Sequence, residues 1–121
     1  MRTPSTILCI DDKELELSLR KMVLEGAGYA VFTATNATKA LELFRAQRID
    51  LVITDNLPGI RSHTLPAELR HLSPHLPVMV LSGGSTLPAA VAPPDYYLHK
   101  LEGPTEMIAR VQDAIAGSPA T

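Results

Sequence analysis

The sequence predicts an α/β fold in which helices cover both faces of a parallel five-stranded sheet. Short apolar runs recur about five times along the chain, and the segments between them carry apolar residues at helical spacing. Glycine, proline and small polar residues separate the two patterns. Apolar runs without alternation are typical of strands buried on both faces, as they are in a parallel sheet. The succession of the two patterns therefore predicts a doubly wound arrangement.

Size and composition are those of one globular domain. The chain has 121 residues, of which 45% are apolar and 20% are charged, and this length is close to the most common domain size. We expect a single domain over residues 1–121, with a core at about 6–117 and a short flexible tail at 118–121.

Charge and cysteine content exclude several classes of protein. The net charge of −2 provides no basic surface for nucleic acid, and no apolar run approaches the roughly 18 residues of a membrane span. The polar segment 1–5 lacks the apolar centre of a signal peptide, and the single cysteine, Cys9, can form no internal disulfide. These features predict a cytoplasmic protein that contacts neither nucleic acid nor membrane, with Cys9 as a small buried hydrophobic residue.

The first strand and helix meet at a pair of aspartates. Strand-forming residues fill Thr6–Ile10, and the run stops at Asp11 and Asp12. Either aspartate is suited to cap the next helix, because a carboxylate stabilises a helix N-terminus. The predicted apolar face of this helix consists of Leu15, Leu19, Met22 and Val23, and its end is marked by Gly26 and Gly28.

A second strand and helix lead to the central strand. Ala30–Ala34 is a less apolar strand, and Thr35 or Asn36 is positioned to cap the helix after it. The apolar face of that helix consists of Ala37, Ala40, Leu41 and Phe44. The segment 51–59 then reads LVITDNLPG, so Asp55 ends an apolar strand and a Pro-Gly turn follows.

The second half of the chain has weaker helical signals. A short helix is predicted from Leu65, Leu69 and Leu72, with a stop at Ser73-Pro74. Residues 78–81 form a fourth buried strand. Three prolines between residues 85 and 94 limit the expected fourth helix to a short or irregular piece.

The last strand and helix are better defined. Tyr96–His99 is the fifth strand, and Pro104 stands at the favoured first position of the final helix. The apolar face of that helix consists of Met107, Ile108, Val111 and Ile115, and Gly117 ends it.

Polar side chains stand at the carboxyl ends of four predicted strands. They are, in chain order, Asp11 and Asp12, then Asp55, then Ser82, then Lys100. In a doubly wound, flavodoxin-like sheet of the order 2-1-3-4-5, the first and third strands are neighbours, and ligands bind at this edge. That order would bring three carboxylates close together. Alone, Asp11 or Asp12 is more often a helix cap, Ser82 a turn residue and Lys100 a solvated strand end, whereas Asp55 interrupts a buried run.

A cluster of carboxylates repels itself and therefore requires protons or a cation. Two carboxylates about 4 Å apart repel by about 4 kcal/mol at an effective dielectric of about 20. Oxygen ligands without His or Cys suit Mg²⁺. With the positive charge of Lys100 and the neutral donor of Ser82, the edge is suited to a phosphoryl group beside a metal. Asp55 is the candidate nucleophile, because aspartyl phosphates are known covalent intermediates.

Four segments resemble the receiver domains of bacterial two-component response regulators. They are ILCIDD at the first strand, LVITD at the third, VMVLSG at the fourth and YYLHK at the fifth. The resemblance extends over nearly the whole chain. It implies that Asp55 accepts a phosphoryl group from a phosphohistidine on a sensor histidine kinase or a histidine phosphotransfer protein. It also implies a signalling domain, not a metabolic enzyme, that takes part only in its own phosphorylation and dephosphorylation.

The resemblance implies a magnesium site at the same edge. Asp12 would bind Mg²⁺ directly, and Asp11 would assist, often through water. Asp55 and the backbone carbonyl of Leu57 would be further ligands.

The resemblance further implies a switch. Ser82 and Lys100 would each contact a phosphoryl oxygen, and Tyr97 would change rotamer on activation. Phosphorylation would then remodel the surface near the fourth helix and the fifth strand for an unknown downstream effector.

The chain departs from the family pattern in two loops. Pro58 stands three residues after Asp55, where the family usually has a proline at four. Leu101 follows Lys100 in place of the usual proline, and Pro104 comes later.

Other functions remain open from the sequence. The short loop after Asp55 motivates a receiver-like docking module that is not phosphorylated. A phosphatase of the haloacid-dehalogenase type would need a second aspartate at Lys13, and a flavin carrier would need a hydroxyl-rich loop after the first strand. Homodimerisation is also left open.

Overall fold

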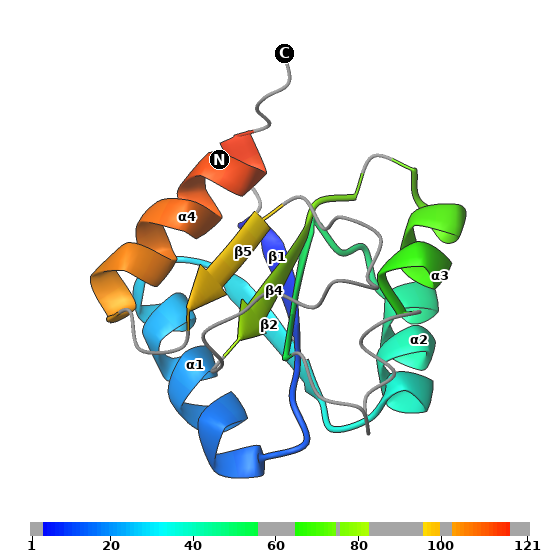
Figure 1. Cartoon of the computed structure of the whole chain (residues 1–121), viewed down its shortest axis with the longest axis horizontal. Coiled ribbons are helices and arrows are strands. Elements are labelled where there is room, and N and C mark those ends of the chain that lie inside the picture. Colours follow the sequence, from blue (N-terminus) through cyan, green and yellow to red (C-terminus); the bar gives the residue numbers. More distant parts are fainter. Residues whose placement is uncertain (1–3, 56–64, 75, 83–95, 100–102, 117–121) are drawn as a thin grey trace.

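The computed structural model describes residues 4–55, 65–74, 76–82, 96–99 and 103–116 (Figure 1). Its elements, in chain order, are β1 (Thr6–Ile10), α1 (Glu14–Gly26), β2 (Ala30–Ala34), α2 (Ala37–Ala46), β3 (Leu51–Asp55), α3 (Leu65–Leu72), β4 (Val78–Ser82), β5 (Tyr96–His99) and α4 (Pro104–Ala116). The predicted strands and helices are confirmed within these ranges. The expected helix between residues 85 and 94 lies outside them.

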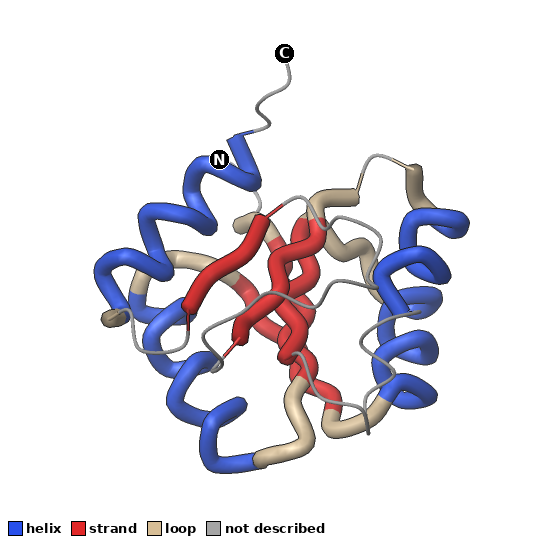
Figure 2. The backbone as a smooth tube through the Cα atoms, in the orientation of Figure 1, coloured by secondary structure: helices blue, strands red, loops and turns tan. Residues whose placement is uncertain are grey.

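The five strands form one parallel sheet in the order β2-β1-β3-β4-β5, as predicted. Helices α1 and α4 lie on one side of the sheet, and α2 and α3 lie on the other (Figure 1). The tube in Figure 2 shows the strands between these two helical layers. Among the described helices none is both long and apolar enough to cross a membrane.

Each face of the sheet has its own apolar cluster. Under α1 and α4 the cluster includes Ile7, Cys9, Ile53, Leu24 and Val111. Under α2 and α3 it includes Leu8, Ile10, Val52, Ala40 and Leu69. Successive strand residues point to opposite faces, so the continuous apolar runs of the central strands supply both clusters. This double burial explains why those runs showed no alternation.

The amino ends of β1 and β3 are joined through Asp50. The Thr6 backbone N–H donates to Asp50 Oδ2 at 2.8 Å, and the Asp50 N–H donates to the Thr6 carbonyl at 2.8 Å. These two bonds fix the register between strands that are 44 residues apart in sequence. Asp50 therefore has a structural role at the edge of the sheet opposite the predicted site.

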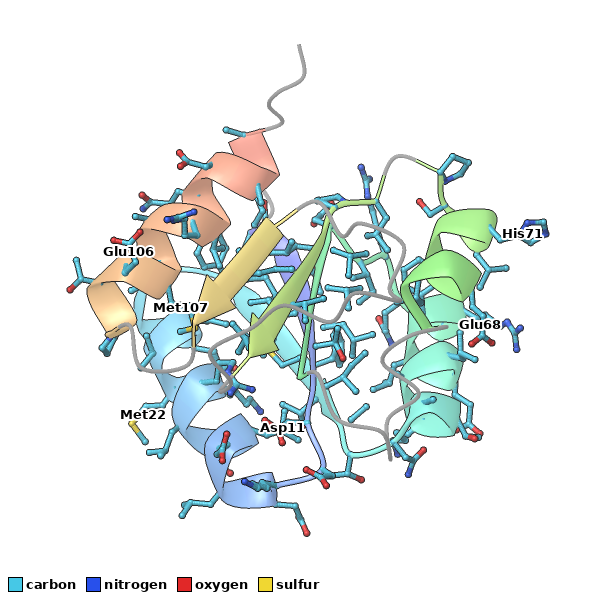
Figure 3. The ribbon with its side chains drawn as sticks, in the orientation of Figure 1. Asp11, Met22, Glu68, His71, Glu106 and Met107 are labelled. Carbon is cyan, nitrogen blue, oxygen red and sulfur yellow. The ribbon has the colours of Figure 1, made fainter. Side chains whose placement is uncertain are left out.

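The predicted apolar face of α1 is wrong. Leu15, Leu19 and Met22 are 73%, 53% and 68% exposed, and Met22 points away from the sheet (Figure 3). The side chains buried against the sheet are Leu17 and Leu24, with only Val23 of the predicted set packed partly against the core.

A charged residue on the inner face of α1 explains the error. Arg20 lies three residues after Leu17 and four before Leu24, so the three share one side of the helix. Its side chain is only 9% exposed, because it reaches the carboxylate of Asp11. Because Arg20 is charged, the buried face of the helix does not show a regular apolar pattern. The exposed Leu15 and Leu19 have the more regular helical spacing and were therefore predicted as the apolar face.

The helix caps match the predictions in one case of two. Neither aspartate caps α1: Lys13 occupies the N-cap position with no side-chain bond, and Asp11 Oδ1 accepts from the Lys13 N–H at 2.9 Å. The carboxylate thus stabilises the turn before the helix and not its first turn. At α2 the prediction is confirmed, because Asn36 Oδ1 accepts from the Lys39 N–H at 2.8 Å.

Two leucine substitutions in α1 test its orientation. Leu24→Ala is expected to lower the free energy of unfolding by about 2–5 kcal/mol, because it leaves a cavity at a fully buried position. Leu15→Ala, the same change at an exposed position of the same helix, is expected to stay within about 0.5 kcal/mol. Urea unfolding of both variants measures the difference, and comparable losses would contradict the orientation.

Candidate functional site

The strand register brings three of the predicted site positions to one edge of the sheet. Ile10 of β1 pairs with Thr54 of β3, so Asp11 and Asp55 are the next residues on two adjacent strands. Asp55 in turn pairs with Leu81 of β4, and Ser82 ends that strand. Neighbouring strands are about 4.8 Å apart. The backbone therefore places Asp11, Asp55 and Ser82 side by side at the carboxyl ends of β1, β3 and β4.

Asp11 is a fully buried carboxylate. Its backbone N–H donates to the Ala34 carbonyl at 3.1 Å, which continues the pairing of β1 with β2 by one residue. Its Oδ1 accepts from the Lys13 N–H, and its Oδ2 faces the Arg20 guanidinium. Figure 3 shows Asp11 at the end of β1, beside α1. These contacts hold the carboxylate in one orientation at the sheet edge.

Arg20 is a site residue that the sequence reasoning missed. Its Nη1 and Nη2 atoms both lie 3.5 Å from Asp11 Oδ2, and Nη2 lies 3.7 Å from Glu16 Oε1. Glu16 Oε2 also lies 3.5 Å from Lys13 Nζ. A signal was present, since Glu16 and Arg20 are four residues apart on a predicted helix that begins at the acidic pair.

Asp12 has the opposite environment from its neighbour. It is exposed, whereas Asp11 is buried. Together the two residues offer one hydrated carboxylate and one oriented carboxylate, and hard oxygen donors of this kind suit Mg²⁺. Among the side chains that the structure describes, no three His, Cys, Asp or Glu residues gather into a metal-binding group. The fit to Mg²⁺ rests on the donor chemistry of this acidic pair.

The remaining predicted positions are described in part or not at all. Tyr97 lies in β5, where its backbone pairs with Val80 of β4. Leu57, Lys100 and the two loops that depart from the family pattern lie outside the described residues.

Cys9 is buried in the core, two residues before Asp11. It is fully buried in the cluster under α1 and α4, as predicted. Burial raises the pKa of the Cys9 thiol from 9.0 to about 12; the Arg20 charge opposes this rise and the Asp11 charge adds to it. The thiol is therefore neutral at physiological pH and acts as a packing group.

Comparison with known proteins gives one consistent family. A family model described as the response regulator receiver domain matches residues 7–112. The autoinducer 1 sensor kinase/phosphatase LuxN of Vibrio harveyi is 35% identical over 81 residues. That match covers 66% of this chain but 10% of LuxN. The chain thus spans about a tenth of the length of this curated relative.

Solved structures agree with this result over almost the whole chain. A putative response regulator from Chloroflexus aurantiacus superposes with a TM-score of 0.85 at 33% identity, covering 95% of this chain and 100% of that one. The response regulator TrrA from Thermotoga maritima superposes with a TM-score of 0.79 at 28% identity, covering 91% and 98%. TrrA was solved in complex with Mg²⁺ and BeF.

Proposed function

The chain belongs to the response regulator receiver domain family, and from this membership we propose that Asp55 is the phosphoacceptor of a two-component signalling pathway. The observation that carries the proposal is the strand register, which sets Asp55 at the end of β3 directly beside the buried Asp11. A phosphoacceptor needs a carboxylate next to a cation site, and the carboxylates of Asp11 and Asp12 beside Asp55 support such a site here.

The proposed reaction transfers a phosphoryl group from a histidine of the donor protein to Asp55. An Asp55 oxygen forms a bond to phosphorus while the bond from phosphorus to a histidine nitrogen of the donor breaks. The electron pair of the broken bond stays on the imidazole, which takes up a proton. The donor is a sensor histidine kinase or a histidine phosphotransfer protein. The chain would act only on its own phosphoryl group and would not turn over a metabolite.

Asp12, Asp11 and Asp55 would hold Mg²⁺ in this proposal, together with the Leu57 carbonyl. The ion would screen the charges of the approaching phosphoryl group. Exposed Asp12 is suited to direct coordination, and Asp11, oriented by the Lys13 N–H, is suited to a bond through water. The Mg²⁺–BeF complex of TrrA supports this assignment by analogy.

Ser82, Lys100 and Tyr97 complete the proposal as the switch. Ser82 follows Leu81, the partner of Asp55 in β4, so its hydroxyl would reach a phosphoryl oxygen from the next strand. Lys100 would neutralise another oxygen, and Tyr97 would turn inward as these groups move. The changed surface near β5 would be read by a downstream effector. We also propose that residues 6–117 form a single domain and that it operates in the cytoplasm.

A binding surface for the donor lies next to the acidic edge. Leu15, Leu19 and Met22 form an exposed apolar ridge along α1, which begins two residues after Asp12. A histidine-bearing partner seated on this ridge would be close to the carboxylates at the start of the helix. Exposed apolar residues grouped in this way are typical of protein-binding sites.

Substitutions on two helices test this surface. Leu19→Glu is expected to slow phosphotransfer from the kinase at least about tenfold, because it places a charge in an apolar contact. Phosphorylation of Leu19→Glu by acetyl phosphate should proceed as in the parent chain, because this small donor does not bind to the α1 surface. Leu72→Glu is the matched control, since Leu72 is 45% exposed on α3, on the other side of the sheet. Equal slowing by both substitutions would exclude the ridge as the specific contact.

Intact-mass spectrometry tests the proposed function itself. Incubation of the chain with acetyl phosphate and Mg²⁺ is expected to add one phosphoryl group, and EDTA should prevent the addition. A parallel Mg²⁺ titration by calorimetry should show binding at millimolar concentrations or below. A chain that neither binds Mg²⁺ nor accepts a phosphoryl group from acetyl phosphate or a kinase would overturn the proposal and favour a docking module.

A further inference from the structure

One charged side chain at the acidic edge has no part in the proposed phosphotransfer. Arg20 comes from the sheet-facing side of α1, is 9% exposed, and places both terminal nitrogens 3.5 Å from Asp11 Oδ2. We propose that Arg20 is an internal counter-ion that balances Asp11 while no Mg²⁺ is bound, and that it thereby sets the Mg²⁺ affinity of the site. This inference rests on the proposed Mg²⁺ site.

The burial of Asp11 requires a balancing charge. Asp11 is fully buried, and an ionised carboxylate without a partner is very costly at such a position. A guanidinium remains protonated at any physiological pH. Arg20 therefore contributes a balancing charge to Asp11 without a metal, and the contact of its Nη2 atom with Glu16 holds the guanidinium from a second side.

The same charge opposes the binding of a cation. Mg²⁺ held by Asp12 and Asp11 would share Asp11 with a positive group that already contacts this carboxylate from a largely buried position. Like charges that share one carboxylate repel appreciably. Arg20 is thus a positioning residue with two opposed effects: it stabilises the metal-free protein and weakens the metal complex.

Two substitutions separate charge from hydrogen bonding. Arg20→Gln removes the charge and leaves a shorter polar side chain, whereas Arg20→Lys keeps the charge and loses the fork-shaped donor. Calorimetric titration is expected to show Mg²⁺ binding about tenfold or more tighter in Arg20→Gln than in the parent. Arg20→Lys should stay within about threefold of the parent, because its charge is unchanged.

Unfolding with and without metal provides an independent measurement. In EDTA, Arg20→Gln should unfold at a lower urea concentration than the parent, since the buried Asp11 loses the positive charge of Arg20. Saturating Mg²⁺ should stabilise the variant more than it stabilises the parent. If the variant is unfolded in EDTA, the Mg²⁺ concentration that restores its circular dichroism reports its affinity. Lys21→Gln is the matched control, because Lys21 lies on the exposed side of α1 and pairs with Glu25 at 3.9 Å.

The outcomes distinguish this inference from the proposed function. If the parent chain binds Mg²⁺ and Arg20→Gln binds it equally or more weakly, the counter-ion role is overturned and the receiver function is left intact. Equal tightening by Lys21→Gln would also overturn it, because the effect would then come from net charge. Failure of every protein to bind Mg²⁺ would overturn both proposals. Binding by Arg20→Gln alone would establish the counter-ion role in its strongest form.

Discussion

The Asp55→Asn variant is expected to form no phosphoryl adduct under conditions in which the parent chain forms one. Asparagine has nearly the shape of aspartate, so the end of β3 and its pairing with Leu81 should be retained. The amide, however, lacks the anionic oxygen that would attack phosphorus. Intact-mass spectrometry after incubation with acetyl phosphate and Mg²⁺ measures the loss directly.

Asp50→Asn is the control for this experiment. Asp50 stands just before the other end of β3, where its Oδ2 accepts from the Thr6 N–H, and an asparagine oxygen can accept the same bond. This variant should be phosphorylated like the parent. An adduct that persists in Asp55→Asn would move the phosphoacceptor to another residue, and peptide mapping would identify it.

Native Cys9 is expected to react with iodoacetamide at least about a thousandfold more slowly than a free thiol at pH 8. Burial raises its pKa from 9.0 to about 12, so the reactive thiolate is about a thousandfold scarcer, and the surrounding core blocks access as well. Mass spectrometry of the carbamidomethyl adduct over time gives the rate. In concentrated urea the rate should rise to that of an exposed cysteine, and equal rates with and without urea would show that Cys9 is accessible in the native chain.

The same pKa shift predicts how stability depends on alkaline pH. Below pH 9 the thiol is protonated in both the folded and the unfolded chain, so Cys9 contributes no pH dependence. Between pH 9 and about 12 the unfolded chain loses this proton and the folded chain retains it. The contribution of Cys9 to stability should therefore fall as pH rises through this range, and it should be absent in Cys9→Ala.

The fold was predictable because its strands are buried on both faces. Runs such as Leu51–Ile53 are continuous and apolar, and polar or turn-forming residues follow the strands. Strand order followed from the doubly wound rule, and the order then placed Asp11 and Asp55 on neighbouring strands. The fold and the position of the acidic residues could therefore be predicted from patterns within this one sequence.

The orientation of α1 was not predictable in the same way. Periodicity assumes that the inner face of a helix is apolar, and here that face includes Arg20. Its burial depends on Asp11, which is nine residues away and itself buried by the sheet. The spacing of apolar residues cannot show that a charged residue is buried by an ion pair in the folded protein. Leu15 and Leu19 were therefore assigned to the wrong side of the helix.

The register between β1 and β3 has a consequence for biosynthesis. β1 is synthesised before the other four strands of the sheet, yet it occupies an interior place with β2 on one side and β3 on the other. Its pairing with β3, including the bonds between Thr6 and Asp50, closes a loop of more than forty residues. Ile7 and Ile10 therefore remain without one of their neighbouring strands until β3 has been translated. Contacts this distant in sequence slow folding and leave nascent strand edges exposed, so β1 stays open to pairing with other chains until β3 has been synthesised.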